Sequence, residues 1–316
     1  MEARSRLARI AQRRGGSGSS LWHDAVRHLF RQRSAILGMV ILGAMLLVAI
    51  FAPLIATHDP EVSMLDVPEE AALGVKRRTP PCIHLLGCPA DQPQHLLGLD
   101  SNVRDLFSRL VYGARYSLYI GFASVGFAIV IGSALGAVSG YAGGWVDNIT
   151  MRFMDVLLAF PALLLAIAIV TVLGPGLVNA LLAIGIVSIP SYARVMRASV
   201  LSVKERDFVV ADRALGVSPT RILVHRVLPN AITPLIVQGT LGIATAILDA
   251  AALSFLGLGA QPPTPEWGTM LGAERNQVFT APHLVFFPGV AIMLVVLSFN
   301  LLGDGLRDAL DPRLNR

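Results

Sequence analysis

Six apolar stretches dominate this sequence, and each is long enough to cross a lipid bilayer. An α-helix rises about 1.5 Å per residue, so about 20 apolar residues span a hydrocarbon core of roughly 30 Å. The stretches are 35–56, 117–139, 153–173, 178–196, 231–257 and 283–303. Only 15% of the 316 residues are charged, whereas soluble domains carry about 25%. The sequence therefore predicts an all-α membrane protein with six transmembrane helices.

The positive residues predict the orientation of these helices. If the N-terminus lies inside, the inner segments hold 19 of the 26 Lys and Arg residues and the outer segments hold 7. An excess of Lys and Arg marks the cytoplasmic side, so both termini are expected in the cytoplasm. The expected organisation is a basic cytoplasmic tail (1–34), a first transmembrane helix (35–56), an outer loop (57–116), a transmembrane core (117–303) containing a cytoplasmic loop (201–229), and a cytoplasmic tail (304–316).

The outer loop contains both cysteines of the chain, Cys82 and Cys88. On the outer, oxidising side they are expected to form a disulfide, with two free thiols as the alternative. Further along, apolar residues are spaced as one face of a helix: Val103, Leu106, Leu110 and Val111. This spacing predicts an amphipathic helix over 99–112 that lies at the outer membrane interface.

Glycines and prolines within the apolar stretches predict where helices pack closely and where they bend. Glycine recurs at every fourth position in the second stretch, at Gly132, Gly136 and Gly140. Such a pattern lets two helix backbones approach closely, and we expect a packing face there. Kinks are expected at Pro161, Pro190 and Pro234.

Asp249 is the ionisable residue that interrupts the fifth stretch. A carboxylate facing lipid at mid-membrane costs about 2.5–3.5 kcal/mol, so Asp249 must face a protein partner, water or the outer end of its helix. A structural hydrogen bond and a place in a gate or translocation path are both compatible with this position. The histidines show no metal-binding spacing such as HExxH, and the basic residues are not interleaved with aromatic ones. The expected partner of this basic chain is therefore membrane lipid and not nucleic acid.

The cytoplasmic loop has the most detailed pattern in the chain. A first short helix has one face made of Phe208, Ala211 and Leu215. Gly216 is expected to end it, and Ser218 followed by Pro219 is typical of the start of a second helix. The apolar side of that second helix consists of Ile222, Leu223 and Val227. This elbow of two helices could bind a partner protein or lie on anionic lipid, and the pattern alone does not choose between them.

The same loop resembles the EAA loop of ABC-importer permeases, the coupling helix that docks on an ATP-hydrolysing subunit. The similarity rests on ADRALG at 211–216 and on Leu-Pro at 228–229. It departs from the family pattern at Val210, where a Glu is expected, at Asp212, where an Ala is expected, and at Arg226, where Ile is common. The resemblance implies that coupling to the ATPase is carried by Phe208, Ala211, Asp212, Leu215, Gly216, Leu228 and Pro229.

Other stretches resemble the dipeptide and oligopeptide permeases within that family, and the "C"-type subunit in particular. They are HLLGLD at 95–100, RD at 104–105, SRLVYGAR at 108–115, GYAGGWVD at 140–147, DVLLAFP at 155–161, LSFLGLG at 253–259, QPPTPEWG at 261–268 and GDGLRDALDPR at 303–313. The resemblance covers about residues 25–316, apart from an unusual insertion at 67–94. It implies the six-helix bundle of type I ABC-importer permeases, with the elbow as its coupling helix.

The function implied by this resemblance is import of short peptides by alternating access in the plasma membrane. The implied partners are a second homologous permease that completes a heterodimer, two ATP-binding subunits and a substrate-binding protein outside the cell. The chain has no Gly-Lys-Ser/Thr phosphate loop, so we expect no cofactor on it, and expect ATP and magnesium on the partner subunits. Asp249 is the candidate gate residue. The alternatives are a glutathione or nickel-chelate permease of the same family, an ion-coupled secondary transporter, and a membrane scaffold.

Overall fold

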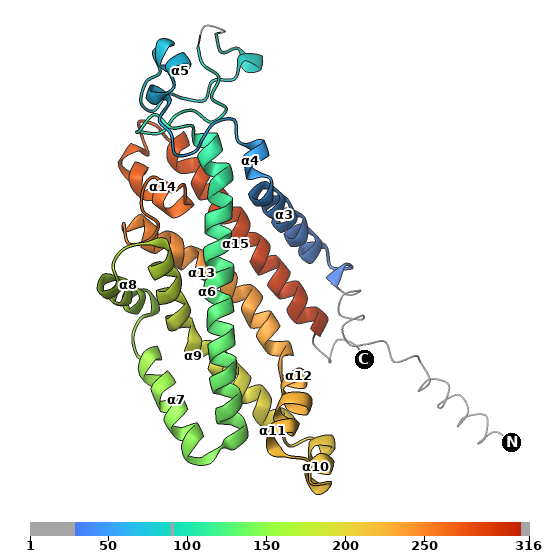
Figure 1. Cartoon of the computed structure of the whole chain (residues 1–316). Helices are drawn as coiled ribbons and strands as arrows, with labels where there is room; N and C mark the ends of the chain where they lie inside the picture. Colours follow the sequence, from blue (N-terminus) through green and yellow to red (C-terminus); the bar gives the residue numbers. More distant parts are fainter. Residues whose placement is uncertain (1–28, 90–91, 311–316) are drawn as a thin grey trace, which may run out of the picture.

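The computed structural model describes residues 29–89 and 92–310, and this part of the chain is almost entirely helical. Five helices are long and apolar enough to cross a membrane. They are α3 (Arg33–Ile50), α6 (Leu106–Ala142), α9 (Leu177–Val203), α13 (Thr233–Phe255) and α15 (His283–Leu310). They run side by side along the long direction of the molecule (Figure 1) and pack against one another in sequence-distant pairs, α6 on α9 and α3 on α15. The predicted all-α membrane fold is confirmed.

Helix α6 is the longest element and extends beyond the predicted span of 117–139. Its 37 residues give a length of about 55 Å, well above the roughly 30 Å of a hydrocarbon core. The separate amphipathic helix predicted over 99–112 is therefore wrong, because residues from Leu106 onward form the first turns of α6. The helix starts there because the Asp105 carboxylate accepts a hydrogen bond from the Ser108 N–H at 2.8 Å. Val103, which the pattern assigned to the helix, has a positive φ of 58°.

The third predicted crossing, 153–173, is two helices instead of one kinked helix. Helices α7 (Gly144–Leu158) and α8 (Ala162–Leu173) meet at an angle of 91°. Pro161 lies at the break; it has no N–H to donate and disfavours the helical conformation at Phe160. The 12 residues of α8 span only about 18 Å. The pair supplies a sixth crossing only if it is counted as one broken span.

The other two prolines do not break their helices. Helix α9 continues through Pro190, and Pro234 lies in the first turn of α13, where its missing N–H has no helical partner to lose.

Two ion pairs hold α7 against α9. Asp155 pairs with Arg194 and Asp147 pairs with Arg197. Asp155 thus pairs across the two helices and not with Arg152, which lies three residues before it in α7. Opposite charges on two packed helices fix their relative position, whereas a pair within one helix would not.

The predicted glycine face is confirmed as the contact between α6 and α9. A Cβ atom at Gly132 would lie 2.7 Å from the Ile189 carbonyl oxygen, and one at Gly136 would clash directly with the Ala193 carbonyl. At Gly140 it would lie 3.0 Å from the Arg197 carbonyl oxygen. Three successive turns of α6 thus contact the α9 backbone, which provides dispersion contacts that lipid cannot replace.

The connecting segments gather at the two ends of the bundle (Figure 1). One end carries α4 (Ala52–Ile55), η1 (Met64–Asp66), α5 (Pro68–Ala72), η2 (His84–Leu86), α14 (Trp267–Glu274) and η4 (Arg275–Gln277). A disulfide joins Cys82 and Cys88 there, with their Cα atoms 5.4 Å apart. The opposite end carries the elbow that follows α9. The predicted tails 1–34 and 304–316 lie partly outside the described residues, at 1–28 and 311–316.

Gly136→Ala should lower the stability of the bundle, because the added methyl overpacks a backbone contact. Overpacking costs about 1–3 kcal/mol, which should appear as a lower thermal midpoint of the purified protein in detergent. Gly126→Ala is the matched control in the same helix, since nothing lies within 4 Å of a Cβ there. Equal midpoints for the two variants would contradict the close contact of α6 with α9.

Candidate functional site

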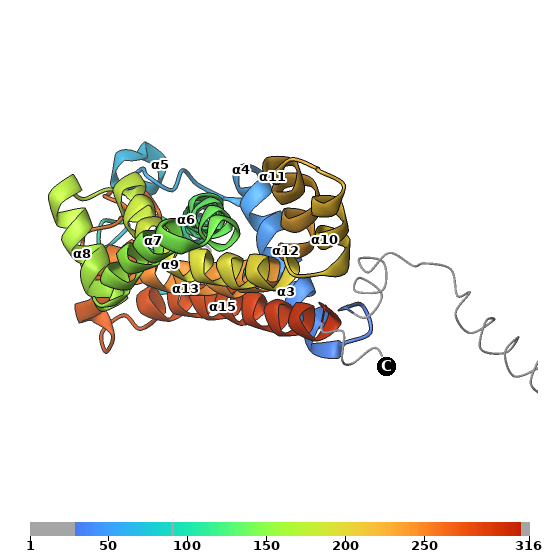
Figure 2. The same cartoon turned by 90° about the horizontal axis from the view of Figure 1, so that it is seen from below.

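The elbow consists of four short helical segments between α9 and α13. They are α10 (Asp207–Ala214), α11 (Pro219–Ile222), the π-helical turn η3 (Leu223–Val227) and α12 (Leu228–Ala231). Figure 2, seen from the elbow end, shows α10, α11 and α12 gathered to one side of the bundle. Pro219 begins α11 as predicted, although the Ser218 side chain makes no capping hydrogen bond.

Gly216 ends the first helix in the predicted manner. Its φ of +78° is in the left-handed region, which residues with a Cβ adopt only at a cost. Two hydrogen bonds close the helix end, from the Gly216 N–H to the Arg213 carbonyl at 3.0 Å and from the Val217 N–H to the Asp212 carbonyl at 3.1 Å. This is a Schellman motif, which satisfies the last carbonyls of α10 and reverses the chain.

The elbow is packed firmly onto the transmembrane core through its inner face. Val209, Ile222 and Val227 are fully buried and belong to the same apolar cluster as Val203 at the end of α9. The predicted apolar side of the second helix is therefore the buried side. Sequence reasoning missed Val209, because it lies between the equally apolar Phe208 and Val210 and the pattern does not tell which of the three points inward.

The outer face of α10 is apolar and uncovered. Phe208 is 40% exposed, Leu215 is 80% exposed and Ala211 is also exposed. We call these three residues the elbow patch. The remaining predicted coupling residues do not extend this patch: Leu228 packs against the core cluster, and Pro229 is exposed in the first turn of α12.

Asp212 and Arg226, the two departures from the family pattern noted above, contact each other. The Arg226 Nε donates to Asp212 Oδ2 at 2.9 Å, from η3 to α10. Asp212 is half-buried and Arg226 is exposed. The pair therefore bridges the two halves of the elbow, on either side of Gly216.

Asp249 lies six residues before the end of α13, toward the outer end of the bundle. It is half-buried, and it makes no side-chain hydrogen bond or ion pair with any other residue within 29–89 or 92–310, so the expected structural hydrogen bond is not found. On one side of it along the helix, Thr245, Ala252 and Leu256 are not buried, whereas on the other side Ala246 and Leu253 are. Asp249 thus lies at the border between the packed face of α13 and a stripe that the rest of the described chain leaves uncovered.

Comparisons with known proteins identify the family. Residues 128–316 match the family described as "Binding-protein-dependent transport system inner membrane component". Residues 20–81 match the "N-terminal TM domain of oligopeptide transport permease C". The chain belongs to the family of binding-protein-dependent transport permeases.

Relatives of known name cover nearly the whole chain. The chain is 48% identical to the dipeptide transport system permease protein DppC of Alkalihalophilus pseudofirmus, over 93% of this chain and 91% of that protein. It is 47% identical to the di/tripeptide transport system permease protein DppC of Pseudomonas aeruginosa, over 89% of each. It is 44% identical to the glutathione transport system permease protein GsiD of Escherichia coli, over 93% of this chain and 91% of that protein.

A solved structure shares the fold. A chain of the MetNI methionine ABC transporter, captured in inward facing conformations, aligns with a TM-score of 0.54 and 20% identity. The alignment covers 64% of this permease and 96% of that chain. The type I ABC-importer permease fold is thus supported by sequence relatives and by a solved structure, with five crossings, or six if α7 and α8 form one broken span.

Charge reversal tests whether Asp212 and Arg226 stabilise the elbow as a pair, and not as two independent residues. Asp212→Arg or Arg226→Asp places like charges together and should loosen the elbow by about 0.5–1 kcal/mol. The double variant should recover most of that loss. Hydrogen exchange of the peptides covering 207–231 measures the effect, with Arg221→Asp as the control because the structure gives Arg221 no ion pair among the described residues. Additive effects in the double variant would contradict the pair.

Proposed function

We propose that this permease is one of two membrane-spanning subunits of an ATP-driven, binding-protein-dependent importer of short peptides. In this proposal a second homologous permease completes a heterodimer, and two separate subunits bind and hydrolyse ATP with magnesium. A substrate-binding protein delivers the peptide from outside. The complex lies in the plasma membrane, with both termini of this chain in the cytoplasm. The observation that carries the proposal is the elbow patch, an uncovered apolar face on a rigid protrusion of a transporter bundle.

The elbow has the construction expected of a part that transmits force. Its outer face (Phe208, Ala211 and Leu215) offers apolar contact area to a partner, while its inner face is buried in the transmembrane cluster. Because one end continues into α13 and the other follows α9, displacement of the elbow displaces both helices. Packed elements switch between discrete arrangements instead of deforming smoothly, so this motion drives alternating access. Asp212 and Gly216 hold the shape of the elbow, and Leu228 and Pro229 lead it into α13.

The uncovered stripe around Asp249 supports the proposed second permease. A carboxylate facing lipid costs about 2.5–3.5 kcal/mol, and no other residue of the described chain pairs with it. A second bundle on this side of α13, enclosing a hydrated path between the two, would remove that cost. In this arrangement Asp249 lines the outer part of the translocation path, where the amino group of a peptide could approach it.

The cargo assigned here is a dipeptide or a slightly longer peptide, because the dipeptide permeases named above are 47–48% identical to this chain. Glutathione is the second candidate, since a glutathione permease is 44% identical over a similar span.

Transport by the full complex in proteoliposomes tests this function and its cargo. Labelled dipeptide should accumulate only when ATP is supplied to the ATPase side, and an uncoupler should not lower uptake while ATP is held constant. Excess unlabelled dipeptide should compete, and excess glutathione should not. Uptake that collapses with the uncoupler would indicate an ion-coupled transporter. Purification of the chain without an ATPase or a second permease would indicate a scaffold.

Gly216→Pro should abolish ATP-driven uptake while leaving the amount of protein in the membrane unchanged. Proline fixes φ near −65°, which is incompatible with the +78° of this turn. It also removes the N–H that donates to the Arg213 carbonyl. Gly216→Asn is the control, because asparagine tolerates the left-handed conformation better than other residues. Uptake by the proline variant at the wild-type rate would disprove the coupling role of the elbow.

A further inference from the structure

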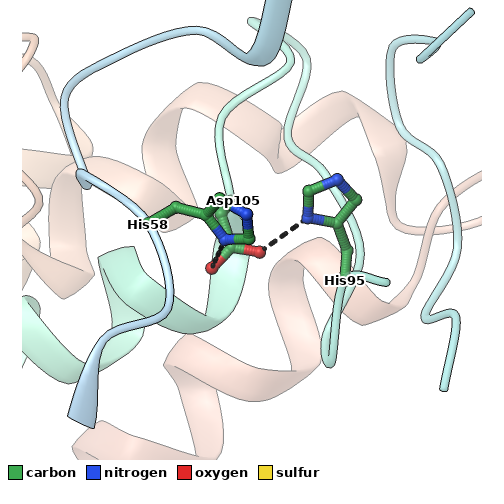
Figure 3. A group of neighbouring side chains, drawn as sticks. All are labelled: His58, His95 and Asp105. Atoms are coloured by element: carbon green, nitrogen blue, oxygen red, sulfur yellow. Dashed lines mark hydrogen bonds and ion pairs between the residues drawn. The ribbon is translucent and has the colours of Figure 1, made fainter. Parts of the chain in front are cut away.

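Two histidines and two carboxylates meet in the outer loop, at the end of the bundle opposite the elbow. His58 follows α4, Glu70 lies in α5, His95 lies before α6 and Asp105 caps α6. The two imidazole rings lie side by side, with centroids 5.1 Å apart (Figure 3).

The two carboxylates lie on opposite edges of this pair of rings. On one edge, Asp105 lies 3.0 Å from His95 Nδ1 and 3.9 Å from His58 Nδ1. On the other edge, Glu70 lies 3.5 Å from His95 Nε2 and 3.7 Å from His58 Nε2. Both Nε2 atoms therefore point toward the same carboxylate.

The edge at Glu70 is left electrostatically unsatisfied. His95 is fully buried, yet its Nε2 and the facing Glu70 Oε2 have no hydrogen-bond partner among the described residues. The Nδ1 of His95 donates its proton to Asp105, so in the neutral ring Nε2 carries only a lone pair. Two acceptors thus face each other at a largely buried site, and either a proton or a metal cation between them would relieve the unfavourable contact.

We propose that His58 Nε2, His95 Nε2 and the Glu70 carboxylate bind one divalent transition-metal ion, with Zn²⁺ as the best fit. Two imidazoles and a carboxylate are a ligand set that zinc accepts. Ligand atoms about 2.1 Å from a tetrahedral ion lie about 3.4 Å apart. Here His95 Nε2 lies 3.5 Å from Glu70 Oε2 and His58 Nε2 lies 3.7 Å from Glu70 Oε1, so a small rotation of the carboxylate brings one oxygen within range of both rings. Glu70 is 17% exposed, which leaves the fourth position open to water. One proton on His95 would satisfy a single contact, whereas the ion satisfies all three groups.

Asp105 acts as a positioning residue in this site. It accepts the Nδ1 proton of His95 and so orients the Nε2 of that ring toward the ion. The Nδ1 of His58 instead lies 3.0 Å from Thr57 Oγ1, with Asp105 at 3.9 Å. The same carboxylate caps α6 through the Ser108 N–H. The ion would therefore fasten α5, which carries Glu70, to the first turn of the longest helix of the bundle.

Metal binding by the full-length, untagged protein in detergent tests the site. The disulfide is kept oxidised, so that Cys82 and Cys88 offer no thiolate. After treatment with a chelator, isothermal titration with Zn²⁺ should show one saturable site per chain. Glu70→Gln and His58→Gln should each weaken binding at least about tenfold, since each removes a ligand. Glu69→Gln and His84→Gln are matched controls, because both residues are exposed neighbours in the same loop.

Each result of this titration decides the question. One site that the two ligand variants weaken and the two controls leave unchanged supports the assignment. No saturable binding would show that a protonated His95 pairs with Glu70 instead. Binding that all four variants retain would place the ion elsewhere on the chain. Co²⁺ absorption in the wild type supplies a second readout, since an imidazole-carboxylate site of low coordination gives intense visible bands and hexa-aquo cobalt does not.

Discussion

The backbone contact between α6 and α9 supports most of this structure. It is possible only because Gly132, Gly136 and Gly140 carry no side chain that would separate the two helices. Within a bilayer the hydrophobic effect does not drive helices together, so such close packing supplies the attraction. Helix α9 in turn carries α7 through two ion pairs and leads directly into the elbow. The outer end of α6 is fixed by Asp105, so one helix pair connects the outer loop to the elbow.

The elbow combines a buried side that fixes it to the bundle with an exposed side that is free to bind. Val209 provides the attachment, and the patch of Phe208, Ala211 and Leu215 provides the free surface. The ion pair of Asp212 and Arg226 shows that two departures from the family pattern can compensate each other and preserve the shape of the elbow. Each charge alone departs from the family pattern, but together they brace the same turn that Gly216 makes.

Much of the fold could be predicted from the sequence, and the predictions that failed did so for physical reasons. Apolar length and glycine spacing predicted the long helices and the packing face of α6, though not its partner α9, since these signals are local and periodic. The break at Pro161 was predicted only as a kink, because its 91° angle depends on how α7 is held against α9. The start of α6 was misplaced because a capping carboxylate, Asp105, outweighs apolar periodicity. Contacts such as Asp212 with Arg226, or His95 with Glu70, join residues separated by variable turns, and spacing along the chain does not encode them.

The acidic residues of the bundle divide into those that the chain satisfies and those that it does not. Asp147, Asp155 and Asp212 each have an arginine partner, and these pairs fix one element against another. Asp249 and Glu70 have no such cation within the described residues, although both are partly buried. Partial burial without a counter-charge is unfavourable, so these two positions are where the chain requires something from outside itself. For Asp249 we propose a hydrated path beside a second permease, and for Glu70 a cation shared with His58 and His95.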